Sequence, residues 1–293
     1  MEIYQLRAFL AVSRLGHLTR AAEQLHLTQP AVSKQVKALE QDLGVLLFER
    51  QPTGMVLTRE GRALFPLAER TLFDAMELLN QARGLRGEVS GDVVIGTIID
   101  PDTLRLGSFL GALLAYFPKV QARLQHGISG WVLERVCAGD LHCGFCLGPV
   151  LDPDVTSLPM RTLQYVVIAP PQWKERLQQA DWAAMAAMPW IGTPSHSSQH
   201  RLVHSMFAER GLSVTPVVEA DQEASMVSLV RNGVGLATMR DDLALEAQRR
   251  GEVCVWPGTV QDCPLSFIFK TARRDDVLVA ACRKALAEVW PSD

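Results

Sequence analysis

The segment 28–44 constrains this chain most, because its residues predict a single helix with two unlike faces. At 100° per residue, one narrow face is aliphatic and consists of Val32, Val36, Leu39 and Leu43. The other face is polar and basic and consists of Gln29, Pro30, Ser33, Lys34 and Lys37. Thr28 is placed to cap the first turn, where a proline costs no hydrogen bond, and Gly44 is placed to end the helix. The aliphatic face needs neighbouring helices, and the polar face is left for solvent or a partner.

Two shorter helices are expected before this segment. Apolar residues at helical spacing predict the first one, up to Gly16. Thr19 is expected to cap the second, at residues 20–25, and His26 with Leu27 is expected to form a tight break. Two short helices, a tight turn and a helix with a polar, basic face have the layout of a helix-turn-helix. In such a unit the start of the second helix faces base edges in the major groove.

The residues that follow predict a two-stranded wing. An apolar strand at 46–48, a polar turn at 50–54 and a returning strand at 55–57 would place Arg50 within reach of a DNA backbone or minor groove. On the helix, glutamine suits adenine, serine suits several bases, and lysine suits guanine or phosphate. The Thr28 hydroxyl and the first-turn N–H groups suit a phosphate. The alternative is a small helical bundle whose basic face is simply solvated.

Residues 6–61, which include AAEQLHLTQPAVSKQVKALEQDLGVLLFER and LTREG, resemble the N-terminal domain of LysR-type transcriptional regulators. The resemblance covers almost every position of that domain and implies a winged helix-turn-helix over residues 1–58. It implies DNA contacts from Thr28, Gln29, Pro30, Ser33, Lys34 and Arg50, and we add Thr19 and Lys37 to the predicted DNA-binding residues. The family often has arginine at position 34. Lysine lacks the two-pronged guanidinium, so we expect a phosphate contact there.

A long helix is expected next, over residues 59–85. Its narrow apolar seam, with alternating spacings of three and four, consists of Phe65, Ala68, Leu72, Ala75, Leu79 and Ala82. Such a seam favours pairing with a second helix, and the alternative is a helix that lies on its own domain. Pro66 is expected near the helix start or at a kink. The resemblance implies that this helix mediates dimerisation, and the glycines of 84–91 mark a hinge, which we place at 86–91.

From residue 92 onward, predicted strands and helices alternate, which indicates α/β layers with mainly parallel sheets. The first helix of this region is expected to start at Asp102. The phrase LVRNGVGLATM matches the family, and the resemblance implies a two-lobed α/β domain like that of periplasmic binding proteins. We place lobe I at 92–161 with 267–293, and lobe II at 162–266. The family often has aspartate where His142 stands, which bears on the hinge and not on the fold.

Turns at the carboxyl ends of strands are the predicted ligand-binding positions, since ligands in such folds bind there. The resemblance implies that they line a cleft for a small-molecule effector. The predicted effector-binding residues are Ile99, Asp100, Thr103, Ser129, Gly130, Thr193, Pro194, Ser195, His196 and His200. The start of the helix after Ile128 suits a carboxylate. Asp100 and Asp102 instead favour an effector with a cationic or hydrogen-donating group, and the alternative for each turn is a plain helix cap.

A metal site, a redox sensor and an enzyme active site have weaker support in the sequence. His196, His200 and His204 are spaced four apart, which suits a metal, but no carboxylate or cysteine is paired with them nearby in sequence, and we expect no metal or cofactor. Cys143 with Cys146, or Cys254 with Cys263, would be the candidates for a redox sensor. The chain lacks G-x-S-x-G, G-x-x-x-x-G-K-[ST] and H-E-x-x-H motifs, so we expect no enzyme.

Composition sets the remaining bounds. The 293 residues suit two or three domains, and 48% hydrophobic with 21% charged residues is typical of soluble globular proteins. The start of the chain predicts no export signal, and we expect a cytoplasmic protein with no membrane partner. The net charge of −3 is weak evidence about nucleic acid. With the resemblance to LysR-type regulators, the expected partners are double-stranded promoter DNA, a small-molecule effector, further copies of the chain as a dimer or tetramer, and RNA polymerase.

Overall fold

The computed structural model describes residues 1–52, 54–84, 89–258 and 260–290. The chain forms two compact units. The first comprises Met1–Gly91 with the short segments 138–140 and 276–278, and the second comprises the remaining residues. Residues 86–88 of the predicted hinge at 86–91 lie outside the described residues.

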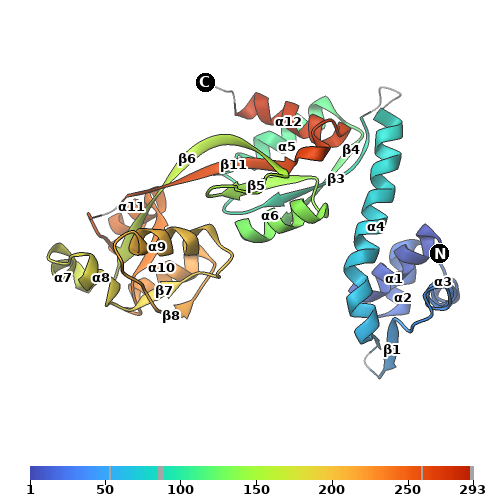
Figure 1. Ribbon diagram of the computed structural model, residues 1–293, viewed down its shortest axis with the longest axis horizontal. Coiled ribbons are helices and arrows are strands. Elements are labelled where there is room, and N and C mark those ends of the chain that lie inside the picture. Colours follow the sequence, from blue (N-terminus) through green and yellow to red (C-terminus); the bar gives the residue numbers. More distant parts are fainter. Residues whose placement is uncertain (53, 85–88, 259, 291–293) are drawn as a thin grey trace. The chain divides into compact units, whose positions relative to one another are not determined.

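The described residues of the first unit form four helices and a two-stranded antiparallel sheet (Figure 1). Its elements are α1 (Ile3–Leu15), α2 (Leu18–Leu25), α3 (Gln29–Leu43), β1 (Phe48–Gln51), β2 (Gly54–Leu57) and α4 (Arg59–Gly84). As predicted, α1 and α3 end at left-handed Gly16 and Gly44. The prediction for Thr19 was wrong, because α2 starts at Leu18 with His17 as its N-cap, which places Thr19 in the first turn.

One core joins these four helices and the wing. The aliphatic face of α3 supplies Val32, Val36 and Leu39, which pack on α1. Phe9 of α1 lies at its centre, with its ring 5.6 Å from that of Phe48. The aliphatic side of α3 therefore anchors the helix in the core, and its polar, basic side lies on another face of the helix.

Helix α4 is part of this core, which corrects one expectation. Ala68 is buried in it, and Phe65 and Leu72 pack against it. The rings of Phe65 and Phe9 are 6.3 Å apart. The first half of the predicted dimer seam thus contacts the protomer's own domain, because α4 crosses α1 there. Further along, Leu79 and Ala82 are exposed, as are Leu67 and Leu78 on another face.

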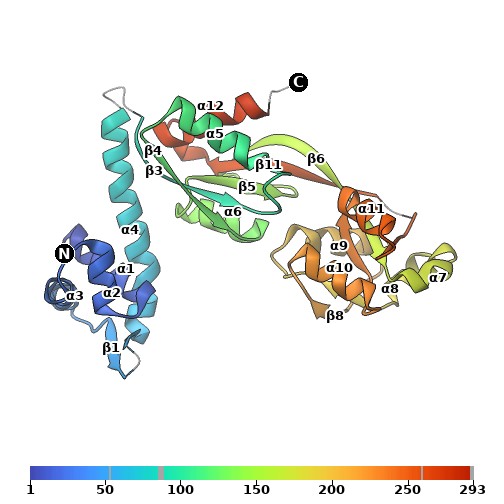
Figure 2. The same ribbon diagram turned by 180° about the vertical axis from the view of Figure 1, so that it is seen from behind.

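The second unit has two lobes linked by the long strands β6 (Val155–Ala169) and β11 (Gln261–Lys270), which run side by side (Figures 1 and 2). Lobe I contains β3 (Gly91–Thr97), α5 (Leu106–Tyr116), β4 (Val120–His126), α6 (Ser129–Ala138), β5 (Cys143–Leu147), η2 (Thr271–Arg273) and α12 (Val277–Val289). Helices α5 and α12 cover one face of its sheet and α6 covers the other.

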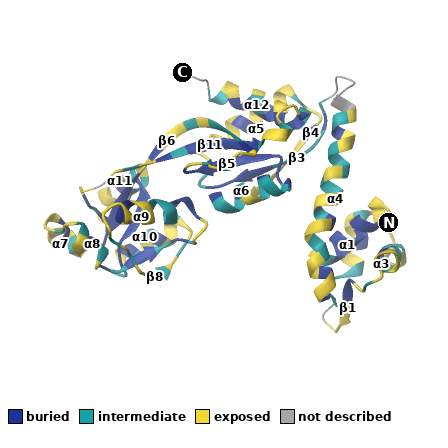
Figure 3. Ribbon diagram, in the orientation of Figure 1, coloured by how far each residue is buried: buried dark blue, intermediate teal, exposed yellow. Residues whose placement is uncertain are grey.

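Lobe II contains the remaining elements. They are η1 (Pro171–Trp173), α7 (Lys174–Gln178), α8 (Trp182–Ala186), β7 (Trp190–Gly192), α9 (Ser198–Ala208), β8 (Pro216–Glu219), α10 (Glu223–Arg231), β9 (Ala237–Arg240), α11 (Asp241–Arg249) and β10 (Cys254–Val255). Buried apolar residues fill each lobe, and β5 is buried along its whole length (Figure 3).

Two expectations for this unit were wrong. The main sheet, of order β10-β6-β11-β5-β3-β4, is antiparallel at β6 and β11, although β3 pairs with β5 in parallel. The first helix starts at Leu106 and not at Asp102, because residues 101–105 form a turn in which the N–H of Thr103 donates to Asp100. Among the described residues, no helix is both long and apolar enough to cross a membrane.

Candidate nucleic-acid interface and ligand pocket

The recognition face predicted for α3 is accessible in the structure. Gln29, Pro30, Lys34 and Lys37 are exposed, and Ser33 is half-buried. Thr28 occupies the N-cap position with extended backbone, but its hydroxyl makes no cap hydrogen bond. The hydroxyl and the first-turn N–H groups of α3 therefore remain available to a phosphate.

The wing is fastened to the recognition helix and to the turn before α2. Glu40 of α3 accepts hydrogen bonds from the N–H groups of Leu47 and Phe48, at 2.8 and 3.3 Å. The N–H of Met55 donates to the Gly16 carbonyl at 2.7 Å. Arg50 is exposed as expected, but it lies on β1 opposite Met55 and not in the turn. The pairing continues beyond it to Gln51 and Gly54, so the turn is shorter than predicted.

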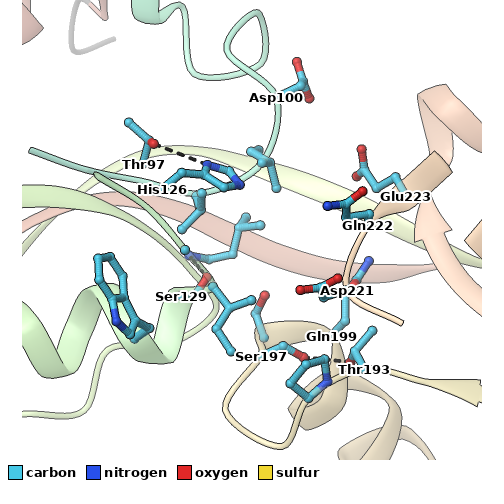
Figure 4. Close-up of a pocket in the computed structure, with 18 of the residues that line it drawn as sticks. Thr97, Asp100, His126, Ser129, Thr193, Ser197, Gln199, Asp221, Gln222 and Glu223 are labelled. Carbon is cyan, nitrogen blue, oxygen red and sulfur yellow. Dashed lines mark hydrogen bonds between the residues drawn. The ribbon is translucent and has the colours of Figure 1, made fainter. Parts of the chain in front are cut away.

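The second unit contains a pocket of about 940 Å³ between its two lobes. This volume is typical of small-molecule sites. Six of the predicted effector-binding residues line it: Ile99, Asp100, Ser129, Thr193, Pro194 and His196. Figure 4 shows Thr97, His126 and Ser129 on the lobe I side, and Thr193, Ser197 and the run 221–223 on the lobe II side.

Four predicted residues do not line this pocket. Thr103 is buried in the turn that holds Asp100, Ser195 is exposed elsewhere on its loop, and His200 lies against a smaller cavity behind α9. Gly130 instead joins the lobes, because its N–H donates to the His196 carbonyl at 3.0 Å. These four residues were predicted because they lie in or next to strand-to-helix turns. Such turns also contain residues that stabilise the turn without facing a ligand.

Buried hydroxyl groups line the lower part of the pocket in Figure 4. Ser129 is 3% exposed, and its oxygen accepts the Leu147 N–H at 3.0 Å. Thr193 and Ser197 lie 2.7 Å apart, and the Ser197 oxygen also accepts the His200 N–H. Within the described part of the chain, these bonds leave unused the hydroxyl proton of Ser129 and one proton of the Thr193–Ser197 pair. Each can donate to a ligand.

Asp100 and Glu223, which line the upper part of the pocket, belong to a charge network centred on Arg240, beside the pocket, that the sequence did not predict. Arg240, only 3% exposed, makes two hydrogen bonds to Asp242 at 2.9 and 3.0 Å and one to Asp100 of the other lobe. Glu223 lies 4.0 Å from the same guanidinium. The sequence feature that could have indicated this network is Arg240 at the carboxyl end of a buried strand, because ligands bind near such strand ends in α/β folds.

The pKa values of the three carboxyl groups diverge. Partial burial, the largest single effect, would raise the pKa of Asp100 and of Asp242. The hydrogen bonds and positive charge of Arg240, together with hydrogen bonds from Thr103 to Asp100 and from Leu243 to Asp242, outweigh it and lower both pKa values. Burial raises the pKa of Glu223, and neighbouring Asp100 and Asp242 add to the rise against the opposing effect of Arg240. The negative charges of Asp100 and Asp242 are thus stabilised beside the Arg240 guanidinium, whereas the negative charge of Glu223 is not.

The two cysteine pairs lack the arrangement of a disulfide switch. Cys254 pairs with Ala169 and Cys263 with Leu163, positions six residues apart along β6, or about 20 Å. Cys143 and Cys146 lie three residues apart on β5 and point to opposite faces. Burial raises the pKa of Cys146 and of Cys263 to about 11, which suppresses the reactive thiolate. Among the described residues there is no group of three potential metal ligands.

Comparison with known proteins decides the family. The family described as "Bacterial regulatory helix-turn-helix protein, lysR family" matches residues 3–62, and "LysR substrate binding domain" matches residues 86–291. This chain belongs to the LysR family of transcriptional regulators. It is a DNA-binding regulator with an effector-binding domain, and not an enzyme.

Individual relatives agree with this assignment. The chain is 32% identical to the transcriptional regulator IlvR of Caulobacter vibrioides over an alignment of 242 residues, and this alignment covers 81% of each chain. It is 36% identical to TcbR of a Pseudomonas species over 146 residues, about half of each chain. The crystal structure of the LysR regulator CbnR covers all of both chains with a TM-score of 0.68 at 23% identity, which supports the fold alone.

Proposed function

We propose that this LysR-type regulator binds promoter DNA as a dimer that assembles further into a tetramer, and that a small molecule in the inter-lobe pocket controls this binding. The recognition face of α3 would read base edges through Gln29 and Ser33, and Lys34, Lys37 and Arg50 would contact phosphates. The accessibility of that face on a packed helix is the observation that carries the DNA part of the proposal.

The ligand part rests on where the pocket lies. Lobe I supplies Ser129 and lobe II supplies Thr193 and Ser197, so one bound molecule would contact both lobes. The unused hydroxyl protons, with the N–H groups at the starts of α6 and α9, favour a carboxylate or another small anion at this end. Such a ligand shifts the protein's conformation only if it binds one arrangement of the lobes better than another.

Dimerisation would place two recognition helices about one DNA turn apart, on an approximately palindromic site. A change in the lobes, passed on through residues 86–91, would alter that spacing and the bend of the DNA. We further propose that the protein works in the cytoplasm, contacts RNA polymerase, and needs no resident metal or cofactor.

A mobility-shift assay on the DNA upstream of the protein's own gene tests the proposal. We expect a retarded complex that resists excess unrelated DNA, and we expect Gln29→Ala and Ser33→Ala to remove that resistance. Unchanged sequence-specific binding by both variants would refute the readout assignment.

A further inference from the structure

The two ends of the inter-lobe pocket differ in chemistry. Figure 4 shows Thr193 and Ser197 at one end, Asp100 and Glu223 at the other, and Asp221 between them. The first end offers hydroxyl protons that are unused by the described residues. The second offers carboxylates. A ligand that extends from one end to the other would therefore meet hydrogen donors first and negative charge second.

The negative end has more carboxylates than its cation can compensate. Asp100, Asp242 and Glu223 share the single guanidinium of Arg240. Asp221 is exposed to the pocket and has no ion pair among the described residues. None of the described residues that line the pocket is lysine or arginine. A ligand placed here would need positive charge, since burying unpaired carboxylates is costly.

The hydroxyl end supplies the second, independent observation. Ser129, Thr193 and Ser197 are 3%, 5% and 6% exposed, so their donors are shielded from bulk water. The N–H groups of Ser198 and Gln199, at the start of the eleven-residue helix α9, have no partner among the described residues. Shielded donors at a helix start favour an anionic group. The apolar wall of the pocket includes Ile98, Ile128 and Trp131.

We infer that the effector is a zwitterion of the amino acid class, with its carboxylate at the hydroxyl end and its ammonium group at Asp221 and Glu223. This inference rests on the proposed function, because it names the ligand of the same pocket. The ammonium group would supply the charge that Arg240 leaves uncompensated. An apolar side chain would contact the wall formed by Ile98, Ile128 and Trp131.

The test measures the melting temperature of the full-length protein with the twenty L-amino acids. Each is compared with the acid that lacks its amine and with the amine that lacks its carboxylate, and neutral sugars form a separate arm. We expect at least one amino acid to raise the melting temperature through preferential binding to the folded state, and its two truncated analogues to act far more weakly. No shift with any amino acid, or an equal shift with the acid that lacks the amine, would overturn the zwitterion inference.

Variants assign the binding to the pocket. Asp221→Asn should weaken the responding amino acid about tenfold, as expected for loss of one charged hydrogen bond. Asp262→Asn is the control, because Asp262 is exposed on β11 and does not line the pocket. Equal affinity in both variants would overturn the assignment of Asp221.

The outcomes also separate this inference from the proposed function. A shift with simple carboxylates or with sugars but not with amino acids, abolished by Thr193→Val, would keep the pocket as the effector site and reject the zwitterion. A bound compound that is insensitive to Asp221→Asn, Glu223→Gln and Thr193→Val would reject the pocket itself.

Discussion

The backbone N–H of Gly130 donates to the carbonyl oxygen of His196 at 3.0 Å, which joins the first turn of α6 in lobe I to the loop before α9 in lobe II. A Cβ atom at position 130 would lie 2.2 Å from that oxygen, closer than real Cβ atoms approach. This contact therefore requires glycine. It lies beside the pocket, where His196 and Ser129 are lining residues.

Gly130→Ala tests whether this close approach of the lobes is part of the response to a ligand. We expect the variant to fold and to bind DNA, but to lose most of its ligand-induced rise in melting temperature, because the lobes cannot close on the pocket. Gly111→Ala is the matched control, since a Cβ atom there on α5 meets nothing within 4 Å. An undiminished ligand response in Gly130→Ala would contradict the importance of the contact.

Arg240→Met should destabilise the second unit by about 2 kcal/mol, because it leaves Asp100, Asp242 and Glu223 facing one another without a cation. This loss is smaller than that for a fully buried pair because Asp100 and Asp242 are 37% and 57% exposed. Urea unfolding of the variant and the wild type measures it.

The pH dependence of this loss has a definite sign. The pKa values of Asp100 and Asp242 are lowered in the folded protein, so their contribution is fully present above the ordinary carboxyl pKa of about 4. It is lost as the pH falls through the lowered values. The difference in unfolding free energy between Arg240→Met and the wild type should be large at pH 7 and shrink below about pH 4. A constant difference across that range would contradict the ion-pair explanation.

The exposed part of α4 is where we expect a second protomer to pack. Leu79, on the predicted dimer seam, is 53% exposed on a helix whose first half is already occupied by its own domain. Leu79→Glu should convert a dimer to a monomer at micromolar concentration in analytical ultracentrifugation, because it places a charge in the helix pair. Leu151→Glu provides the control, since Leu151 is 87% exposed outside α4. A dimer unaffected by Leu79→Glu would assign dimerisation to another surface.

Several helices and strands could be predicted from local pattern. The helix α3, with Thr28 before it and Gly44 after it, agrees with the sequence expectation. The dimer seam was less predictable, because the same apolar spacing serves a partner helix or the protomer's own core. Ala68 has the second role.

Two further features depended on distant residues. Strands β6 and β11 are antiparallel partners about a hundred residues apart in sequence, and only half of β6 is apolar enough to predict a strand. The pocket residues Asp221 and Glu223 lie at a helix start, where acidic residues are ordinary. Their role depends on Arg240 and on Asp100, and these two residues are 140 positions apart in the sequence. No local pattern contains that pairing.

Lys34 is expected to contact phosphate and not bases. Lys34→Ala should weaken binding to specific and unrelated DNA alike and reduce the slope of log affinity against log salt concentration by about 1. Titrations at several salt concentrations measure this slope. Lost discrimination between sequences with an unchanged slope would instead assign Lys34 to base readout.

The most direct test of sequence recognition is the ratio of affinities for the upstream site and for unrelated DNA, measured at one salt concentration for Gln29→Ala and Gln41→Ala. Both glutamines are exposed on α3, but only Gln29 lies on the predicted reading face, and Gln41 lies near the other end of the helix. We predict that Gln29→Ala lowers this ratio by about tenfold or more, from the loss of one base contact worth about 1–3 kcal/mol, and that Gln41→Ala leaves it unchanged. An unchanged ratio in Gln29→Ala, or an equal fall in both variants, would contradict sequence reading by the start of α3.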